Sequence, residues 1–376
     1  MSTSPFIDRS GWTPPSSLDL WEPILISKEQ IDAEIERLAS QPRPANGRRQ
    51  SLIVHPRWKE LGVGPGLNPG VTVTLEVLKP GEETTPIRHN STQINFCIKG
   101  AGACIINGKR IQYSQYDTWN FPSMAAYRHI NDSKDIHARL CYSNAAMLEK
   151  LNIHIVEDDP KESHLHVVAE EKVEATGAHI ASAATPPTEK IVKLGEDGAY
   201  LMPYEVLINP APVESKILHW PWLGLKAELD KLGGLDKNYK GRRLYMMWNP
   251  ATGRHNGVTP NFFATITIRP PGIIDRPHRH TSAAINYYFH GTGYSVVEKK
   301  RYDWKAGDLM LSAPGWGIHN HASNDQPVYE LTVQDQPLMI YMESLLRQED
   351  LKKPWRVLGT ESGFETNRDA AQIKTA

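Results

Sequence analysis

The sequence of 376 residues predicts an all-β protein built from two tandem antiparallel barrels of the jelly-roll type, with a few peripheral helices. Two observations support this fold class. Short segments rich in β-branched residues, such as 71–77 and 263–268, alternate with Gly, Pro and Asp turns. The same order of turn residues also occurs twice along the chain. A series of short strands with regular turns is typical of a closed or sandwiched antiparallel barrel.

The internal repeat keeps its register over most of one barrel. The pairs separated by 191 positions are Pro80 and Pro271, Gly81 and Gly272, His89 and His280, Gly100 and Gly291, Gly102 and Gly293, and Asp117 and Asp308. One residue is then inserted, and the offset of 192 relates Pro122 to Pro314 and His129 to His321. Chance would not preserve one register through so many turn residues, so the two halves are predicted to share one fold.

The repeat divides the chain into five segments. We expect an N-terminal arm with a helix (1–69), an N-terminal barrel (70–147), a linker and lead-in with a short helix (148–259), a C-terminal barrel (260–342), and a C-terminal helix and tail (343–376). The first helix is predicted from the capping box at 27–30, the second over 225–232 before two glycines, and the third over 343–352. The polar stretch 157–190 is the expected linker.

Composition excludes several classes of protein. The net charge is −1 and charged residues make up 23% of the chain, so no basic field indicates a nucleic-acid partner. No apolar run has the length of a transmembrane helix, and the first residues lack the features of a signal peptide. The three cysteines, Cys97, Cys104 and Cys141, are expected to be reduced thiols in a cytoplasmic protein.

The segment Pro277-His278-Arg279-His280 is the strongest candidate for a functional site. Histidines at i and i+2 of an extended strand point to the same face. His319, which follows a Pro-Gly turn, can complete a triangle of three imidazoles around one metal ion. A second pair, His164 and His166, lies in a polar stretch without the following glycines and is interpreted as a surface feature.

The N-terminal barrel has lost this set of histidines. The repeat places Ile87 at the position of His278, His89 at that of His280 and Tyr127 at that of His319. An aliphatic side chain cannot coordinate a metal, so the N-terminal barrel is predicted to be metal-free. Its expected roles are packing, contact between subunits or forming one wall of the active pocket.

The order of a His-x-His strand, a glycine turn, a Gly-Asp turn and a Pro-x-x-x-x-His strand resembles the cupin superfamily. The second half is also similar to the gentisate 1,2-dioxygenase group, which includes salicylate and 1-hydroxy-2-naphthoate dioxygenases. The matching residues are Arg242-Arg243, Trp248 to Gly253, Pro260, Pro277 to His280, Gly291 to Gly293, Gly307-Asp308 and Pro314 to His321. The resemblance covers most of 45–342 and implies a bicupin, two tandem double-stranded β-helix barrels.

The resemblance also implies a cofactor and a reaction. One Fe(II) per chain would be bound in the C-terminal cupin barrel by His278, His280 and His319, with O₂ as co-substrate. The implied activity is extradiol-type cleavage of a small aromatic acid, a gentisate- or salicylate-like 2-hydroxybenzoate. The ring would open between the hydroxylated and the carboxyl-bearing carbons, with both oxygen atoms incorporated. Ala284 stands where many cupins carry a glutamate ligand, which leaves coordination positions for a chelating anion.

Several further residues are assigned to the catalytic centre. Asn286 stands where the related enzymes carry an arginine suited to the substrate carboxylate. His321, two residues after His319, is assigned beside it, either as an alternative ligand or as a group supporting the ligands. Arg242 and Arg243 are the candidates for binding the carboxylate, although both could equally be solvated surface charges. The side chains expected to wall an aromatic pocket, unless they belong to the core, are Trp248 and Trp316.

Other functions fit the same histidines. The site could cleave a β-diketone or another chelating enolate, or carry Zn(II), Mn(II) or Ni(II) for isomerisation or hydrolysis. A non-catalytic sensor or storage barrel is a third possibility. Ring substituents such as nitro, amino or halide are compatible with the altered position 286. Bicupins associate through strand edges and N-terminal segments, so we expect a homo-oligomer, a dimer or a tetramer.

Overall fold

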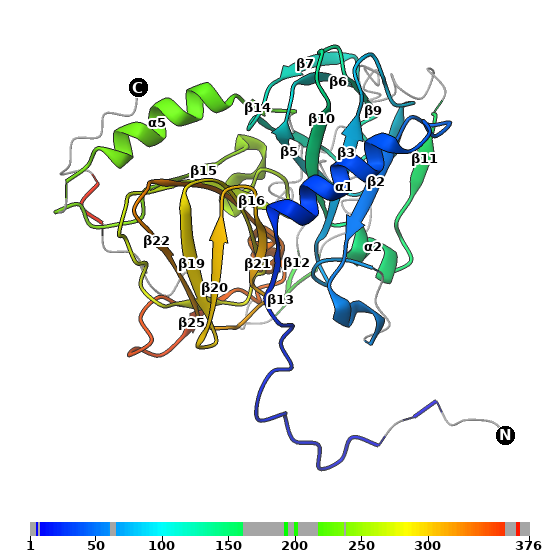
Figure 1. The fold of residues 1–376 in the computed structure, drawn as a ribbon. Helices are drawn as coiled ribbons and strands as arrows, with labels where there is room; N and C mark the ends of the chain where they lie inside the picture. Colours follow the sequence, from blue (N-terminus) through cyan, green and yellow to red (C-terminus); the bar gives the residue numbers. More distant parts are fainter. Residues whose placement is uncertain are drawn as a thin grey trace.

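A computed structural model describes residues 5–6, 8–60, 65–160, 192–194, 199–201, 217–236, 238–357 and 366–368. It contains two antiparallel barrels that lie side by side (Figure 1). The prediction of an all-β protein with two tandem barrels and few helices is therefore confirmed. The expected linker around 183–187 and the histidine pair 164 and 166 lie outside the described residues.

The N-terminal barrel consists of a six-stranded sheet that faces a five-stranded sheet. The first has the order β14-β8-β5-β10-β3-β2, and the second has the order β11-β4-β9-β6-β7. The strands are β2 (Arg49–Ile53), β3 (Thr72–Leu78), β4 (Ile87–His89), β5 (Gln93–Lys99), β6 (Gly102–Ile106), β7 (Lys109–Tyr113), β8 (Thr118–Phe121), β9 (Tyr127–Ile130), β10 (His137–Ser143), β11 (Val156–Asp158) and β14 (His219–Trp220).

The C-terminal barrel repeats this arrangement. Its six-stranded sheet has the order β1-β21-β18-β23-β16-β15, and two three-stranded sheets, β20-β19-β22 and β17-β24-β25, lie opposite. The strands are β1 (Ile24–Ile26), β15 (Leu244–Met247), β16 (Phe263–Arg269), β17 (Arg279–His280), β18 (Ala284–His290), β19 (Thr292–Val297), β20 (Lys300–Lys305), β21 (Leu309–Ala313), β22 (His319–Ser323), β23 (Val328–Gln334), β24 (Leu346–Gln348) and β25 (Arg356–Val357). A separate two-stranded sheet pairs β12 (Val192–Leu194) with β13 (Ala199–Leu201) in antiparallel orientation.

Two strands cross from one half of the chain to the other barrel. β1, from the N-terminal arm, pairs with β21 in the C-terminal barrel. β14, from the segment before the second barrel, pairs with β8 in the N-terminal barrel. Each crossing strand covers an edge that would otherwise expose unpaired backbone groups. The segment boundaries drawn from the sequence remain a prediction, and this strand exchange is a feature that they did not include.

The helices lie at the periphery. The capping box predicted at Ser27 and Gln30 opens α1 (Lys28–Ser40), which buries Ile31, Ile35 and Leu38. The helix predicted over 225–232 is α5 (Trp222–Gly233), which begins three residues earlier than expected and packs on β16. Two short helices, α2 (Ala145–Lys150) and α6 (Gln336–Tyr341), follow the last long strand of each barrel. No helix in the described part of the chain is long and apolar enough to cross a lipid bilayer.

The helix predicted over 343–352 is wrong. α6 ends at Tyr341, and the following residues form β24, which pairs with β17 on one side and β25 on the other. The physical reason is that β17 would otherwise leave backbone groups without partners at the edge of the barrel. Leu346 and Arg347 are half-buried and Gln348 is buried, as expected for a strand packed between two neighbours.

Aromatic side chains fill the contact between the barrels and the interior of each barrel. Phe96 from the first barrel contacts Tyr287 and Phe289 from the second, with ring centroids 5.7 and 5.6 Å apart. Inside the second barrel, Tyr288 and Trp304 stack at 3.7 Å. The three cysteines are buried and free, as expected. The barrels therefore form a continuous core that fixes the strands carrying the histidines.

Candidate metal centre

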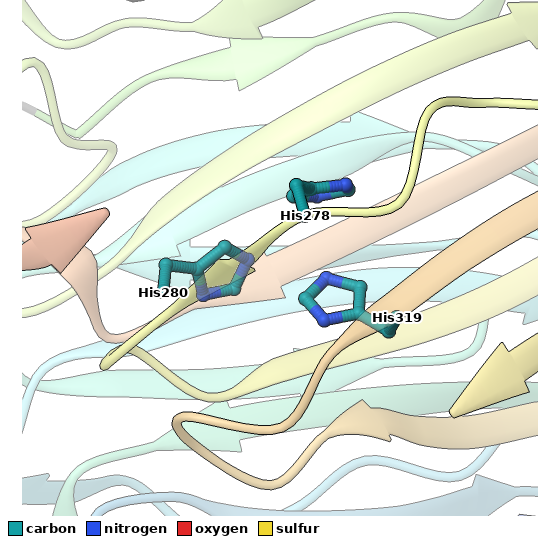
Figure 2. A group of neighbouring side chains, drawn as sticks. All are labelled: His278, His280 and His319. Carbon is teal, nitrogen blue, oxygen red and sulfur yellow. The ribbon is translucent and has the colours of Figure 1, made fainter. Parts of the chain in front are cut away.

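The three predicted ligands meet at one place on the wall of the C-terminal barrel. His278 precedes β17, His280 ends it, and His319 begins β22. The backbones of His278 and His319 exchange two hydrogen bonds, with N–O distances of 3.0 and 2.9 Å. The potential ligand nitrogens of the three rings lie within 4.8 Å of one another. Figure 2 shows the rings converging from these two segments of chain. This spacing suits coordination of a single ion.

Hydrogen bonds fix which nitrogen of each ring is available. In each ring Nδ1 lies within hydrogen-bond distance of the carbonyl of a residue two positions away. The distances are 3.0 Å from His278 to Arg276, 2.8 Å from His280 to Ser282, and 2.9 Å from His319 to Gly317. A carbonyl can only accept, so Nδ1 carries the proton and donates it. Each Nε2 is left with a lone pair, as is usual for metal-ligating histidine.

The rings are also held in the neutral state that metal binding needs. His278, His280 and His319 are between 2% and 4% exposed. Burial is the main cause that lowers the pKa of all three, and it brings the pKa of His319 to about 3. Burial disfavours the charged imidazolium because its hydration is lost. At neutral pH the site therefore offers three uncharged nitrogen donors.

His321 lies beside the three ligands but outside the cluster that they form. Its Nδ1 is 2.8 Å from Ser295 Oγ, which also accepts a hydrogen bond from Trp304 Nε1 at 2.9 Å. Burial lowers the pKa of His321 to about 3. Of the two candidates for the third ligand, the geometry favours His319. His321 lines the adjoining cavity as a neutral, hydrogen-bonded side chain.

A cavity of about 310 Å³ opens from the histidines into the barrel. Its apolar wall includes Met246, Phe263 and Ile268, which can enclose an aromatic ring. Asn286 and Ala284 also line it. Asn286 donates to Thr332 Oγ1 at 2.9 Å and accepts from the Ser312 hydroxyl, so its amide orientation is fixed. Ala284 contributes no carboxylate, in agreement with the sequence.

The cavity wall is rich in positive charge. Its described residues include five arginines and two carboxylates, namely Arg242, Arg243, Arg269, Arg347 and Arg368 with Asp275 and Glu330. Arg269 donates to both carboxylates, at 2.9 Å to Asp275 and 3.0 Å to Glu330. Although burial opposes ionisation, Arg269 holds the pKa of Asp275 below its usual value. A site with this lining favours an anionic ligand.

The structure separates the predicted substrate residues into two groups. Arg242 lines the cavity and forms an ion pair with Glu349 at 3.1 Å. Arg243 also lines it, but its guanidinium donates to the carbonyl oxygens of Leu232, Leu235 and Asp236 at the end of α5. The Arg243 guanidinium therefore caps the C-terminal end of that helix.

Neither predicted tryptophan lines the cavity. Trp248 is 50% exposed. Trp316 instead lies under the guanidinium of Arg279, 4.4 Å from the ring centroid, and contacts Trp355 edge-on. The aromatic wall expected from these two residues is provided by Phe263 and aliphatic neighbours.

Arg347 is one of the cavity residues that the sequence does not reveal. It belongs to β24, within the segment predicted to be a helix. The three residues of β24 do not alternate between apolar and polar side chains, so no local signal indicates a strand there.

The corresponding positions of the N-terminal barrel are arranged differently. Ile87 and Tyr127 are paired across β4 and β9, as His278 and His319 are in the other barrel. His89 Nε2 is 2.9 Å from the Tyr127 hydroxyl, and Phe121 stacks on the Tyr127 ring at 3.9 Å. The repeat mapping of these positions is thus matched by the strand pairing. That this barrel binds no metal remains a prediction.

Comparison with known proteins agrees with this architecture. A sequence profile described as a cupin domain matches residues 74–143, within the N-terminal barrel. The chain is 21% identical to a 5-aminosalicylate 1,2-dioxygenase of Comamonas sp over 277 residues, 72% of this chain and 66% of that protein. It is 29% identical to a 5-nitrosalicylic acid 1,2-dioxygenase of Bradyrhizobium sp over 135 residues, 35% of this chain and 65% of that protein. The matches thus span just under two thirds of either relative.

The solved structures show the same fold over a larger part of the chain. The crystal structure of a salicylate 1,2-dioxygenase from Pseudaminobacter salicylatoxidans superposes with a TM-score of 0.67 at 16% identity. The superposition covers 89% of this chain and 90% of that one. At this identity the likeness establishes the arrangement of the strands, and the chemistry has to be argued from the residues described above.

Proposed function

Starting from the two-barrel cupin fold of this chain, we propose that it is a metal-dependent dioxygenase that opens the ring of a 2-hydroxybenzoate. The substrate class is salicylate or a ring-substituted salicylate such as gentisate. The bond broken lies between the hydroxylated carbon and the carbon that carries the carboxylate. The observation that carries this proposal is a cluster of three neutral histidines that opens onto a cationic, partly apolar cavity.

The residues fit one divalent transition metal per chain. Three neutral Nε2 donors from His278, His280 and His319 would hold the ion, and no carboxylate of the described residues belongs to the cluster. We propose Fe(II) as the ion, because O₂ chemistry needs a redox-active metal. When bound, iron would supply the binding of a chelating anion and the electrons for O₂ activation. A chelating substrate anion would then supply the negative charge that the protein ligands lack.

The other cavity residues would orient the substrate. The side chains of Met246, Phe263 and Ile268 enclose the ring and exclude water from it. Asn286, held by Thr332 and Ser312, offers a fixed amide to a substrate oxygen. The low pKa of His321 keeps that ring uncharged, so it can exchange hydrogen bonds without adding positive charge.

Two coarser features belong to the same proposal. The three buried, free cysteines fit a cytoplasmic protein. A homo-oligomer, a dimer or a tetramer, follows from the resemblance to bicupins, and light scattering coupled to gel filtration measures it.

Oxygen uptake with a substrate panel tests the proposed reaction. Protein is reconstituted anaerobically with Fe(II), and an oxygen electrode records uptake with salicylate, 5-aminosalicylate, 5-nitrosalicylate, gentisate and, as a different chelating class, a β-diketone. We expect uptake with at least one salicylate and loss of the aromatic absorbance. Absence of uptake with every salicylate, in protein with one iron per chain, would contradict the proposal. Uptake with the β-diketone alone would assign the site to that class instead.

A ligand variant connects this activity to the site. His280→Ala removes one of three donors, so we expect iron content and oxygen uptake to fall together. His290→Ala is the matched control, because His290 is exposed at the end of β18 and Nδ1 bonds only the carbonyl of Pro327 among the described contacts. Equal iron content in the wild type and His280→Ala would refute the ligand assignment.

A further inference from the structure

The loss of arginine at position 286 leaves open which group binds the substrate carboxylate. Each of the five arginines in the cavity wall has partners within the protein, so the backbone register has to decide between them. Arg243 donates to three carbonyl oxygens at the end of α5, and Arg269 bridges two carboxylates. Arg368 donates to the Leu244 carbonyl and stacks over Tyr245 at 4.9 Å.

The backbone register places Arg347 directly beside a metal ligand. β24 pairs with β17 so that Arg347 is the cross-strand partner of His280, and Gln348 is the partner of Arg279. Cross-strand partners share a face of the sheet, with Cβ atoms about 4.5–5.5 Å apart. The outer pair confirms the register, since Arg279 Nε donates to Gln348 Oε1 at 2.7 Å. Arg347 therefore shares the inward face with His280.

Arg347 is held in place and aimed at the cavity. It lines the cavity, and Nη2 donates to Glu349 Oε1 at 2.6 Å. Arg242 reaches the other oxygen of the same carboxylate, with Nη2 3.1 Å from Glu349 Oε2. Glu349 thus bridges the guanidinium groups of Arg242 and Arg347.

We propose that Arg347, oriented by Glu349 and assisted by Arg242, binds the carboxylate of the aromatic acid at this site. This inference rests on the proposed function for the choice of substrate class. A 2-hydroxybenzoate that chelates an ion held by the three histidines would have its carboxylate beside this cluster, and Arg347 is the cross-strand partner of one of the three. The guanidinium of the cross-strand partner is then positioned to donate two hydrogen bonds to that carboxylate. The arginine that binds the carboxylate would then come from β24, which lies outside the repeated barrel segments, because position 286 carries asparagine.

The test measures binding without turnover. Protein is loaded with Zn(II), which is redox-inert, and isothermal titration calorimetry gives the Kd of salicylate, benzoate and catechol. Catechol chelates a metal but has no carboxylate. For Arg347→Gln we expect the Kd of salicylate to rise roughly 10- to 100-fold, as for loss of a charge-assisted hydrogen bond. The Kd of catechol should change less than about 3-fold.

Two further variants separate binding from structure. Arg347→Lys keeps the charge but not the two-pronged geometry, so its Kd for salicylate should lie between those of the wild type and Arg347→Gln. Glu349→Gln removes the carboxylate that orients both arginines, so we expect the Kd of salicylate to rise while the Kd of catechol changes little. Arg301→Gln is the matched control, because Arg301 is exposed, pairs with Asp303 and stacks over Tyr294, away from the cavity lining.

The outcomes distinguish this inference from the proposed function. Equal weakening of salicylate and catechol by Arg347→Gln, or no change in either, overturns the carboxylate assignment. Failure of the wild type to bind any aromatic carboxylate also overturns it. If salicylate binds and Arg347 controls its affinity, but the iron-loaded protein consumes no oxygen, the inference stands and the proposed reaction fails. Thermal melts and zinc content of each variant identify any that fail to fold, and Arg347→Lys then provides the comparison.

Discussion

Replacing Arg269 by methionine is expected to destabilise the C-terminal barrel more than any surface charge substitution. The guanidinium donates to Glu330 at 3.0 and 3.2 Å and to Asp275 at 2.9 and 3.2 Å. The side chains of Arg269 and Glu330 are each 4% exposed, whereas that of Asp275 is 26% exposed. Methionine fills a similar volume but leaves Glu330 as a buried charge without its partner.

The magnitude follows from this burial. Removing one partner of a buried ion pair costs about 3–5 kcal/mol, because the remaining charge has lost both water and its counterion. A typical protein has only about 5–15 kcal/mol of total stability. With a urea m-value of about 3 kcal/mol/M, the midpoint of the transition should fall by about 1–1.7 M.

Urea unfolding followed by tryptophan fluorescence measures this effect. Arg301→Met is the control, since its pair with Asp303 is exposed and such pairs contribute about 0–1 kcal/mol. Arg269→Met/Glu330→Leu should recover at least half of the loss, because the buried charge is removed together with its partner. A loss for Arg269→Met as small as that for Arg301→Met would refute the reasoning.

Three further predictions concern other parts of the molecule. Burial raises the pKa of the Asp335 carboxyl from 3.8 to about 6, although the Ala283 N–H donates a hydrogen bond to it. The free energy of unfolding should therefore decrease as the pH rises from about 4 to 6, because the folded protein binds this proton more tightly than the unfolded chain. Asp335→Asn should remove this loss, and urea midpoints at pH 4.5 and 7 that shift equally in both proteins would contradict it. Tyr127→Phe removes the hydroxyl bonded to His89 and should cost about 0.5–1.5 kcal/mol without changing iron content, whereas iron loss measured by mass spectrometry would place metal in the wrong barrel. In α5, a Cβ added at Gly224 would have no neighbouring atom within 4 Å, so Gly224→Ala should stabilise the protein by about 1 kcal/mol. A lower midpoint in thermal melts would contradict this.

The parts of the fold set by local pattern were predictable. The repeated turn residues indicated two barrels, and the capping box at Ser27 located the start of α1. The His-x-His spacing and the following turn also sufficed to place His278, His280 and His319 in one cluster. In each case the information lies within a short stretch of chain or in a register repeated along it.

Long-range pairing was not predictable in the same way. β1 and β14 each complete a sheet of the barrel formed by the other half of the chain. These strands have only three and two residues, and so short a segment does not specify a distant partner strand. β24 shows the consequence for function. Because its pairing with β17 is not visible locally, the sequence predicts a helix over this segment and gives no reason to assign Arg347 to the site.

The two predicted tryptophans do not line the cavity, for a related reason. Trp248 and Trp316 are candidates because they are aromatic and lie in stretches that resemble the related enzymes. The strand pairing instead turns Trp316 toward Arg279, on the face opposite to His280. Which face a side chain occupies depends on pairing register, which residue type does not determine.

Labelled oxygen tests the central claim most directly. Iron-loaded protein is given a salicylate under ¹⁸O₂, and mass spectrometry counts the labelled atoms in the product. We expect a ring-opened product that contains both atoms of one O₂ molecule, formed by the wild type and not by His280→Ala. A product without label, or one formed equally well by His280→Ala, would contradict the assignment of dioxygenase chemistry to the three histidines.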